Sequence, residues 1–225
     1  MTTLNRNLPV TLRKIPVKKT SIRGTSPDGK AFESLLERDF YILLSADPTV
    51  ADYFVQSVKV PYQNAAGRER EYFPDALVHY RPDKDGTVQP SLLAEVKPLL
   101  QLERPSDKLK HQMAAATAYA EARGWQYKVV TERDIRIPRL ENIIFLRPFE
   151  KRVPAPEIRE MILVRVQEMR APDVETLLAA IYNDKWNRAT LLPYVWHLIG
   201  TGDIYTDLDK PMTMTTPIWR SKQSL

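Results

Sequence analysis

Three charged residues have the types and spacing that phosphodiester hydrolysis would use. Glu95 lies in a short apolar segment, residues 91–96, and Lys97 follows it directly. Asp75 lies in residues 72–81, which are predicted to form a strand. Side chains along a strand alternate between its faces, so Glu95 and Lys97 point the same way and Asp75 shares a face with apolar neighbours. An acid among apolar residues is costly to bury unless it is paired or binds a metal. The pattern therefore predicts a site rather than a solvated surface.

The predicted chemistry is metal-assisted hydrolysis of a phosphodiester. Carboxylate oxygens are ligands that Mg²⁺ prefers, and Mn²⁺ is expected to substitute for it. A bound cation would lower the pKa of a water molecule and screen charge that develops at phosphorus. The sequence thus predicts Asp75 and Glu95 as metal ligands, with the carbonyl of Val96 as a third. The Lys97 ammonium would orient the attacking water or stabilise the same charge.

A helix before these strands supplies a further acid. Residues 32–44 repeat apolar side chains at helical spacing. At 100° per residue, Glu37 lies at the edge of the apolar stripe and could face the site. Glu33, four residues earlier on the same side, is the rival candidate.

Each residue alone also has a plainer explanation. Asp75 could be an ordinary solvated acid, and Glu95 and Lys97 a same-face ion pair of little value. Glu37 could pair with a base on the helix surface. The order of elements favours the site: a helix acid, a strand acid, a turn, a strand with an acid and a lysine, and an amphipathic helix over residues 106–123.

Secondary structure is predicted along the whole chain. Further strands are expected at residues 53–62, 127–131 and 143–146, and prolines cluster near residues 149–156. Beyond them the pattern becomes helical, and the expected elements are helices at 157–169, 173–184 and 192–199 and a hairpin within 203–219. The predicted fold is an α/β core with a mixed sheet flanked by helices, followed by a helical, winged-helix-like domain. Three tryptophans, Trp186, Trp196 and Trp219, are expected to fill the core of that domain.

The amino-acid composition excludes several kinds of functional site. The chain of 225 residues has no cysteine, which excludes disulfides, thiolate zinc sites and a cysteine nucleophile. His79, His111 and His197 lack metal-ligand spacing. The net charge of +5 suits a polyanion, and residues 1–27 carry six basic residues before the first acid: Arg6, Arg13, Lys14, Lys18, Lys19 and Arg23. That segment reads equally well as a solvated tail. No membrane span or secretory signal is expected.

Several of these stretches resemble TnsA, the endonuclease subunit of heteromeric bacterial transposases, within the PD-(D/E)xK nuclease superfamily. The matching stretches are Ser34–Phe40, Phe73–Val78, Ala94–Pro98 and Trp125–Glu132, and the resemblance spans roughly residues 20–148. Residues 55–57 depart from it, because the family often has a proline after the glutamine.

The resemblance implies a restriction-endonuclease-like fold and cleavage of the 5′ strands at transposon ends with Mg²⁺. It implies a DDE transposase that cuts the 3′ strands, an AAA+ ATPase regulator bound by the C-terminal domain, and a bacterial cytoplasmic, DNA-associated location. The positions that match the family's motifs imply catalytic roles for Glu37, Asp75, Glu95 and Lys97. They also imply that Glu37 is a further metal ligand. A stand-alone restriction- or repair-type nuclease, and a catalytically silent DNA-binding adaptor, are the alternatives.

The expected domains are a basic segment at residues 1–24, the endonuclease at 25–150 and a partner- or DNA-positioning domain at 154–225. Two further sets of residues are expected to contact DNA or a partner. They are Lys108, Lys110 and Gln112 near the site, and Arg220 and Lys222 beside the predicted wing.

Overall fold

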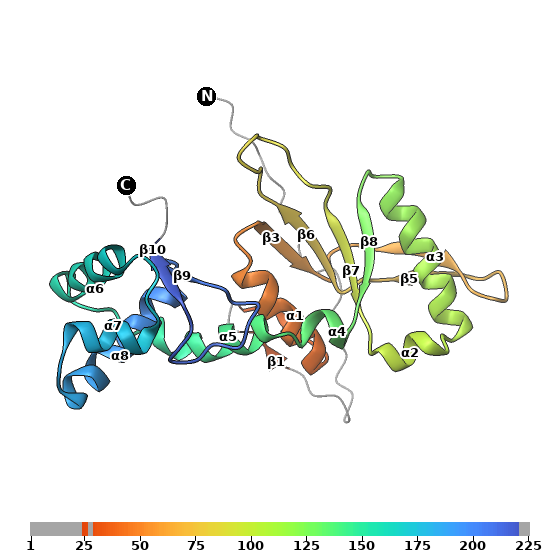
Figure 1. Ribbon diagram of the computed structural model, residues 1–225. Helices are drawn as coiled ribbons and strands as arrows, with labels where there is room; N and C mark the ends of the chain where they lie inside the picture. Colours follow the sequence, from red (N-terminus) through yellow and green to blue (C-terminus); the bar gives the residue numbers. More distant parts are fainter. Residues whose placement is uncertain (1–23, 27–28, 221–225) are drawn as a thin grey trace. The chain divides into compact units, whose positions relative to one another are not determined.

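The computed structural model describes residues 24–26 and 29–220, which divide into two compact units between Arg136 and Ile137. Figure 1 shows the elements of each unit. Most of the predicted basic segment and Lys222 lie outside the described residues. Among the described residues, no helix combines the length and the apolar character that crossing a membrane requires.

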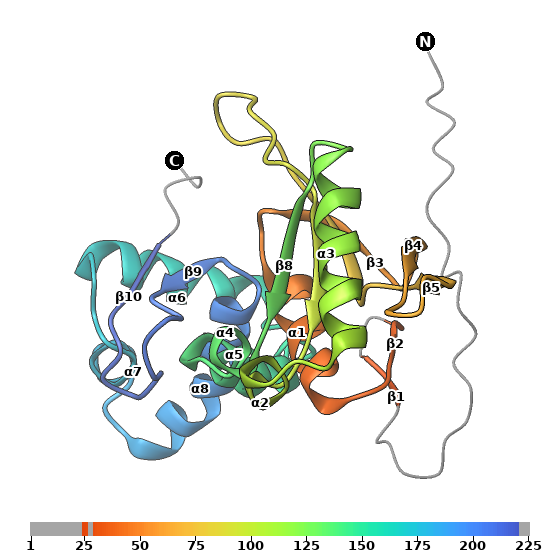
Figure 2. The ribbon, with the colours of Figure 1, turned by 90° about the vertical axis from the view of Figure 1, so that its right-hand side faces the viewer.

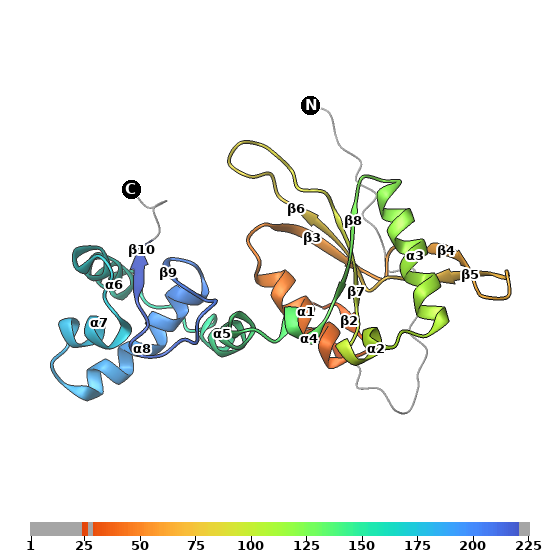
Figure 3. The ribbon, with the colours of Figure 1, turned by 45° about the vertical axis from the view of Figure 1, so that its right-hand side comes forward.

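The first unit is built around a four-stranded mixed sheet in the order β3-β6-β7-β8. The first three strands pair antiparallel, and β8 runs parallel to β7. Helices α1 and α3 lie on opposite faces of this sheet (Figure 3). The strands are β1 (Gly24–Thr25), β2 (Ala31–Phe32), β3 (Val50–Val55), β4 (Val60–Gln63), β5 (Glu69–Tyr72), β6 (Ala76–Tyr80), β7 (Leu92–Val96) and β8 (Gln126–Val130). The helices are α1 (Leu35–Ala46), α2 (Leu99–Glu103), α3 (Asp107–Glu121) and α4 (Glu132–Ile135). The α/β core expected from the sequence is confirmed.

Local sequence explains where the two long helices begin. Ser34 caps α1 by accepting a hydrogen bond from the backbone N–H of Glu37, and Ser106 caps α3 in the same way from Leu109. The buried face of α3 carries Ala116 and Ala120, whose small side chains allow the helix to approach the sheet closely. The β4–β5 hairpin packs beside α3 as well (Figure 2).

Two segments predicted as long strands are each broken in the structure. Residues 53–62 divide into β3 and β4, because Gln56 adopts a left-handed backbone with φ of 45°. Residues 72–81 divide into β5 and β6 around Pro74, which has no N–H to donate to a sheet. The pieces between the breaks, β4 and β5, pair with each other as a separate two-stranded sheet. The breaks place Asp75 just before β6 instead of within a continuous strand.

The second unit consists of helices followed by a short antiparallel hairpin. Its elements are α5 (Pro138–Leu146), η1 (Arg147–Phe149), α6 (Pro156–Met169), α7 (Val174–Ile181), α8 (Lys185–Gly200), β9 (Ile204–Thr206) and β10 (Ile218–Arg220). Aliphatic side chains from the helices and the hairpin share one core with Trp196. The order of helices and hairpin is the expected one, and a winged-helix class stays a prediction.

The strand predicted at residues 143–146 is wrong, because these residues end helix α5. A short apolar run fits a strand and a buried helix equally well, and here Pro138 at the first helical position and Leu140 extend the run into a helix. The Asn142 side chain donates to the carbonyls of Leu208 and Lys210, both at 2.8 Å. These bonds tie α5 to the loop between β9 and β10, and α5 also packs against α8, so the second compact unit begins at Ile137, earlier than residues 149–156.

The tryptophan prediction holds only in part. Trp196 is buried in the second core, but Trp219 is exposed and Trp186 is 85% exposed. The reason is that α8 begins at Lys185, capped by Asp184, well before the predicted start at residue 192. Its first turns therefore extend beyond the core and carry Trp186 into solvent.

Candidate active site

The structure brings Asp75, Glu95 and Lys97 together at the centre of the sheet. The Lys97 ammonium lies 3.9 Å from Asp75 Oδ2 and contacts Glu95 Oε1 directly. It also donates to the carbonyl oxygen of Val96 at 3.2 Å. Glu95 lies on β7, and Asp75 precedes β6, the antiparallel neighbour of β7. The adjacency that the sequence could only suggest is produced by this strand pairing.

Three oxygen atoms converge on the Lys97 ammonium, and they belong to the residues predicted as metal ligands. Within residues 24–26 and 29–220, no group of three or more histidine, cysteine, aspartate and glutamate side chains is placed to hold a metal ion. Only two of the oxygens come from side chains here, while the third is the main-chain carbonyl of Val96. Two carboxylates and a carbonyl around a positive charge are a donor set that fits a hard divalent cation.

Asp75 is fixed by hydrogen bonds at both ends of the residue. Its Oδ2 accepts from the backbone N–H of Val96 at 2.7 Å. Its own carbonyl accepts from the N–H of Gln56 at 3.1 Å and from the Tyr41 hydroxyl at 3.2 Å. Burial raises the pKa of Asp75 well above its ordinary value, and the nearby Glu95 charge raises it further. A buried acid held this rigidly is costly to charge unless a cation compensates.

Glu95 is buried between a lysine and a tyrosine. Lys97 donates to its Oε1, and the Tyr72 hydroxyl donates to its Oε2. Burial and the Glu95 charge raise the pKa of Tyr72, so this hydroxyl remains a donor. Burial also opposes the charge on Lys97, but the carboxylates of Asp75 and Glu95 outweigh it and raise the lysine pKa. Sequence reasoning missed Tyr72, because its type and position in β5 resemble those of any strand tyrosine.

Glu37 is buried at the start of α1, close enough for its charge to act on Asp75 and Lys97. Its Oε2 accepts from the backbone N–H of Glu33 at 2.8 Å, and its Oε1 accepts from the Ser34 hydroxyl at 2.9 Å. Burial raises the pKa of Glu37, and these two hydrogen bonds oppose that shift. The rival Glu33 is half-buried, and the Gln56 amide donates to it at 3.4 Å. Of the two, Glu37 is the more deeply buried beside the cluster.

Two other groups of residues considered in the sequence are a histidine of the second unit and the polar residues of α3. His197 is buried, and its ring nitrogen Nδ1 contacts the carbonyl of Phe149 at 3.1 Å, which gives it a packing role. Lys108 and Lys110 are exposed on α3, and Lys110 pairs with Asp107 at 3.1 Å. Contact of Lys108, Lys110 and Gln112 with DNA stays a prediction.

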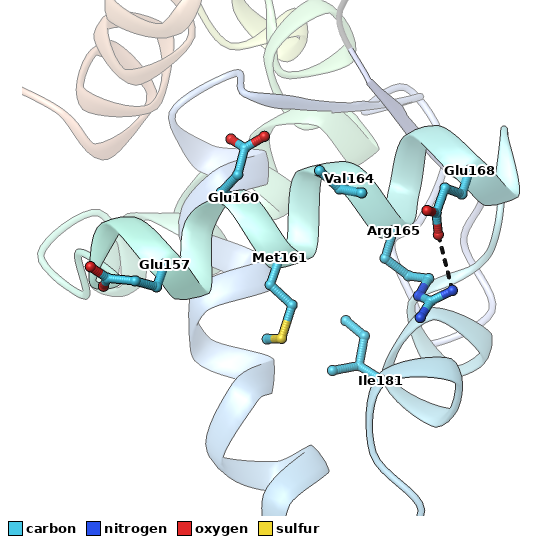
Figure 4. Close-up of a pocket in the computed structure, with 7 residues that line it drawn as sticks. All are labelled: Glu157, Glu160, Met161, Val164, Arg165, Glu168 and Ile181. Carbon is cyan, nitrogen blue, oxygen red and sulfur yellow. Dashed lines mark hydrogen bonds and ion pairs between the residues drawn. The ribbon is translucent and has the colours of Figure 1, made fainter.

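A separate groove lies in the second unit, between α6 and α7 (Figure 4). It encloses about 520 Å³ and is not lined by any of the four predicted site residues. Its lining consists of Glu157, Glu160, Met161, Val164, Arg165, Glu168 and Ile181. Met161 and Ile181 point into it, while Arg165 pairs with Glu168 at 3.0 Å. An apolar floor with an acidic rim has the character of a contact surface and lacks paired buried acids.

Comparison with known families agrees with the α/β fold of the first unit. The N-terminal part, residues 47–132, matches the family described as TnsA-like endonuclease N terminal, and residues 134–208 match TnsA endonuclease C terminal. No curated protein matches the chain significantly. The first match contains Asp75, Glu95 and Lys97, and the two matches meet near the division between the compact units.

The α/β core and the two family matches define the protein as an endonuclease. More narrowly, the chain belongs to the TnsA family, the endonucleases of transposition.

Proposed function

We propose that this chain is the Mg²⁺-dependent endonuclease subunit of a transposase, and that it hydrolyses the 5′ strands at transposon ends. A DDE transposase would act on the other strands, and an AAA+ ATPase would regulate both. The family supports the endonuclease class. The observation that carries the metal dependence is the convergence of Asp75 Oδ2, Glu95 Oε1 and the Val96 carbonyl on one positive charge.

The proposed cation ligands are Asp75, Glu95 and the Val96 carbonyl, with Glu37 as a further acid beside them. When bound, Mg²⁺ would lower the pKa of a water molecule and compensate the negative charge of the phosphate. Lys97, whose ammonium lies beside both carboxylates, would orient the attacking water or neutralise the phosphate. Tyr72 keeps Glu95 oriented throughout, since its hydroxyl remains protonated.

The second unit is proposed to dock the AAA+ regulator or to position DNA, and to contribute no catalysis. The β9–β10 hairpin supports a docking role, because Trp219 and Tyr205 are cross-strand partners and both are exposed. Exposed aromatic pairs beside a basic residue such as Arg220 suit either a protein partner or DNA phosphates.

Cleavage with the partner transposase present tests the nuclease role. The expected result is nicking of 5′ strands in Mg²⁺ or Mn²⁺, binding without turnover in Ca²⁺, and loss of nicking in EDTA. Full activity in EDTA would contradict the proposal. Nicking of any DNA without the transposase would favour a stand-alone nuclease, and metal-independent DNA binding without cleavage would favour a silent adaptor. Within a bacterial cell we propose a cytoplasmic location on DNA.

A further inference from the structure

Gln56 combines two unfavourable features beside the candidate active site. Its backbone is left-handed with φ of 45°, a conformation that residues other than glycine rarely adopt. Its side chain is 2% exposed, and the buried Oε1 has no hydrogen-bond partner among the described residues. Both features raise the free energy of the folded chain. A strained residue that is also unsatisfied calls for a compensating benefit.

The other left-handed residue provides a contrast. In the described part of the chain, Arg170 is the one further residue besides the glycines with positive φ. It follows the last turn of α6 on the surface with ψ of −65°, and the N–H of Ala171 donates across it to the carbonyl of Met169 at 2.9 Å, so it belongs to a tight surface turn. Gln56 instead follows strand β3 and is buried, so a turn on the surface does not account for it.

The contacts of Gln56 join two acids of the candidate site. Its N–H donates to the carbonyl of Asp75 at 3.1 Å. Its amide Nε2 donates to Glu33 Oε1 at 3.4 Å, and the N–H of Glu33 in turn donates to Glu37 at 2.8 Å. The amide orientation is the favourable one, because the reverse would set the Gln56 oxygen against the Glu33 carboxylate. Electrostatics thus turns Nε2 toward Glu33 and leaves Oε1 without a donor.

We propose that Gln56 is a positioning residue for the nuclease site. Its amide holds the Glu33 carboxylate aside, so that Glu37 is the acid of α1 that faces Asp75 and Lys97. Its N–H continues the β3–β6 pairing to the carbonyl of Asp75, and its positive φ turns the chain out of β3 directly after that contact. The inference rests on the proposed function, because positioning has meaning only if these acids hold the cation.

Substitutions at position 56 separate the side chain from the backbone. Gln56→Gly keeps the N–H and permits the positive φ, but removes the amide. Gln56→Glu keeps the size of the side chain and places a second carboxylate against Glu33. Combining Gln56→Glu with Glu33→Gln forms an amide–carboxylate pair with exchanged roles. Arg170→Gly is the matched control, since it relieves the other left-handed residue in the second unit.

The experiment measures Mg²⁺-dependent 5′-strand nicking by the full chain with the partner transposase, together with melting temperatures. Residues that orient metal ligands typically contribute about ten- to hundredfold in activity or metal affinity. We expect Gln56→Gly to lower kcat by about tenfold and to raise the Mg²⁺ concentration for half-maximal cleavage, with KM for DNA little changed. Gln56→Glu should lose more, and Glu33→Gln in that background should recover most of the loss. Arg170→Gly should cleave as wild type does.

The outcomes distinguish this proposal from the function on which it rests. Wild-type nicking by Gln56→Gly would overturn the positioning role while leaving the nuclease intact, provided that Asp75→Ala is inactive. Failure of Glu33→Gln to restore activity in a folded double variant would also overturn it, because the loss would then not come from the Glu33 carboxylate. If the wild-type chain does not nick DNA in Mg²⁺, both proposals fall together.

Discussion

The two units differ in what they bury. Among the described residues, the buried acids all lie in the first unit: Glu37, Asp39, Asp75 and Glu95. The second unit buries aliphatic side chains, with Asn142, His197 and Thr216 as its buried polar residues. Buried carboxylates are unfavourable for stability unless they are compensated, so their concentration in the first unit supports the proposed nuclease site there. The second unit has an apolar core, and none of its described acids is buried.

The largest expected effect comes from removing a charge of the buried cluster. We expect a loss of 5′-strand nicking on the order of a thousandfold or more for each of Asp75→Ala, Glu95→Ala and Lys97→Ala. The reason is that, when catalytic groups act together, removing one costs about as much as removing all of them. Gel assays of nicked DNA measure the rate, and circular dichroism checks the fold. Asp209→Ala is the matched control, since that acid is exposed and pairs with Arg139 at 2.7 Å in the second unit. Wild-type nicking by Asp75→Ala would refute the assignment.

A substitution in the core of the second unit, Leu177→Ala, should lower stability and leave the nicking rate unchanged. Leu177 is fully buried there, and such truncations cost about 2–5 kcal/mol in the free energy of unfolding. Nicking at a temperature where the variant is folded should retain its wild-type kcat. Denaturant melts measure the loss, with the exposed Trp186→Ala as control at below about 0.5 kcal/mol. A large fall in kcat for folded Leu177→Ala would contradict the proposal that the second unit contributes no catalysis.

Metal binding should stabilise the first unit selectively. At a Mg²⁺ concentration of 100 Kd, a ligand that binds only the folded state contributes about 2.7 kcal/mol. We expect a rise in melting temperature for the wild-type chain and for Leu177→Ala, but not for Asp75→Ala, whose cluster lacks one carboxylate. Calorimetric melts with Mg²⁺, Ca²⁺ and EDTA measure this. An equal rise for Asp75→Ala would place the cation elsewhere.

The smallest expected effect concerns Tyr72→Phe. Phenylalanine preserves the packing and removes the hydroxyl that donates to Glu95, so Glu95 loses one of its two restraints. We expect about a tenfold loss of nicking, or 1.4 kcal/mol, and a higher Mg²⁺ requirement. Titration of Mg²⁺ in the nicking assay measures both. Tyr62→Phe is a control in the neighbouring strand β4, and a loss as large in that variant would show that general packing is responsible.

Residue types and local spacing were sufficient for part of the site. Asp75, Glu95 and Lys97 could be selected because acids in apolar, strand-forming segments are rare, and strand alternation places Glu95 and Lys97 on one face. The helix over most of residues 32–44 and the mixed α/β order follow from equally local patterns, although Phe32 lies in β2 and α1 begins only at Leu35. These features depend on neighbours within a few residues, which the sequence displays directly.

The remaining features depend on residues that are far apart in the chain. Tyr72 reaches Glu95 across 23 residues, and Gln56 reaches Asp75 because β3 and β6 pair antiparallel with Val55 opposite Ala76. The apolar run at residues 143–146 fits a strand or a helix by itself, and the helix α5 that contains it is held by packing against α8 and by the Asn142 side chain, which donates to the carbonyl of Leu208. Local periodicity carries no information about such partners. The free energy that selects them comes from burial and from hydrogen bonds formed only when the whole unit folds.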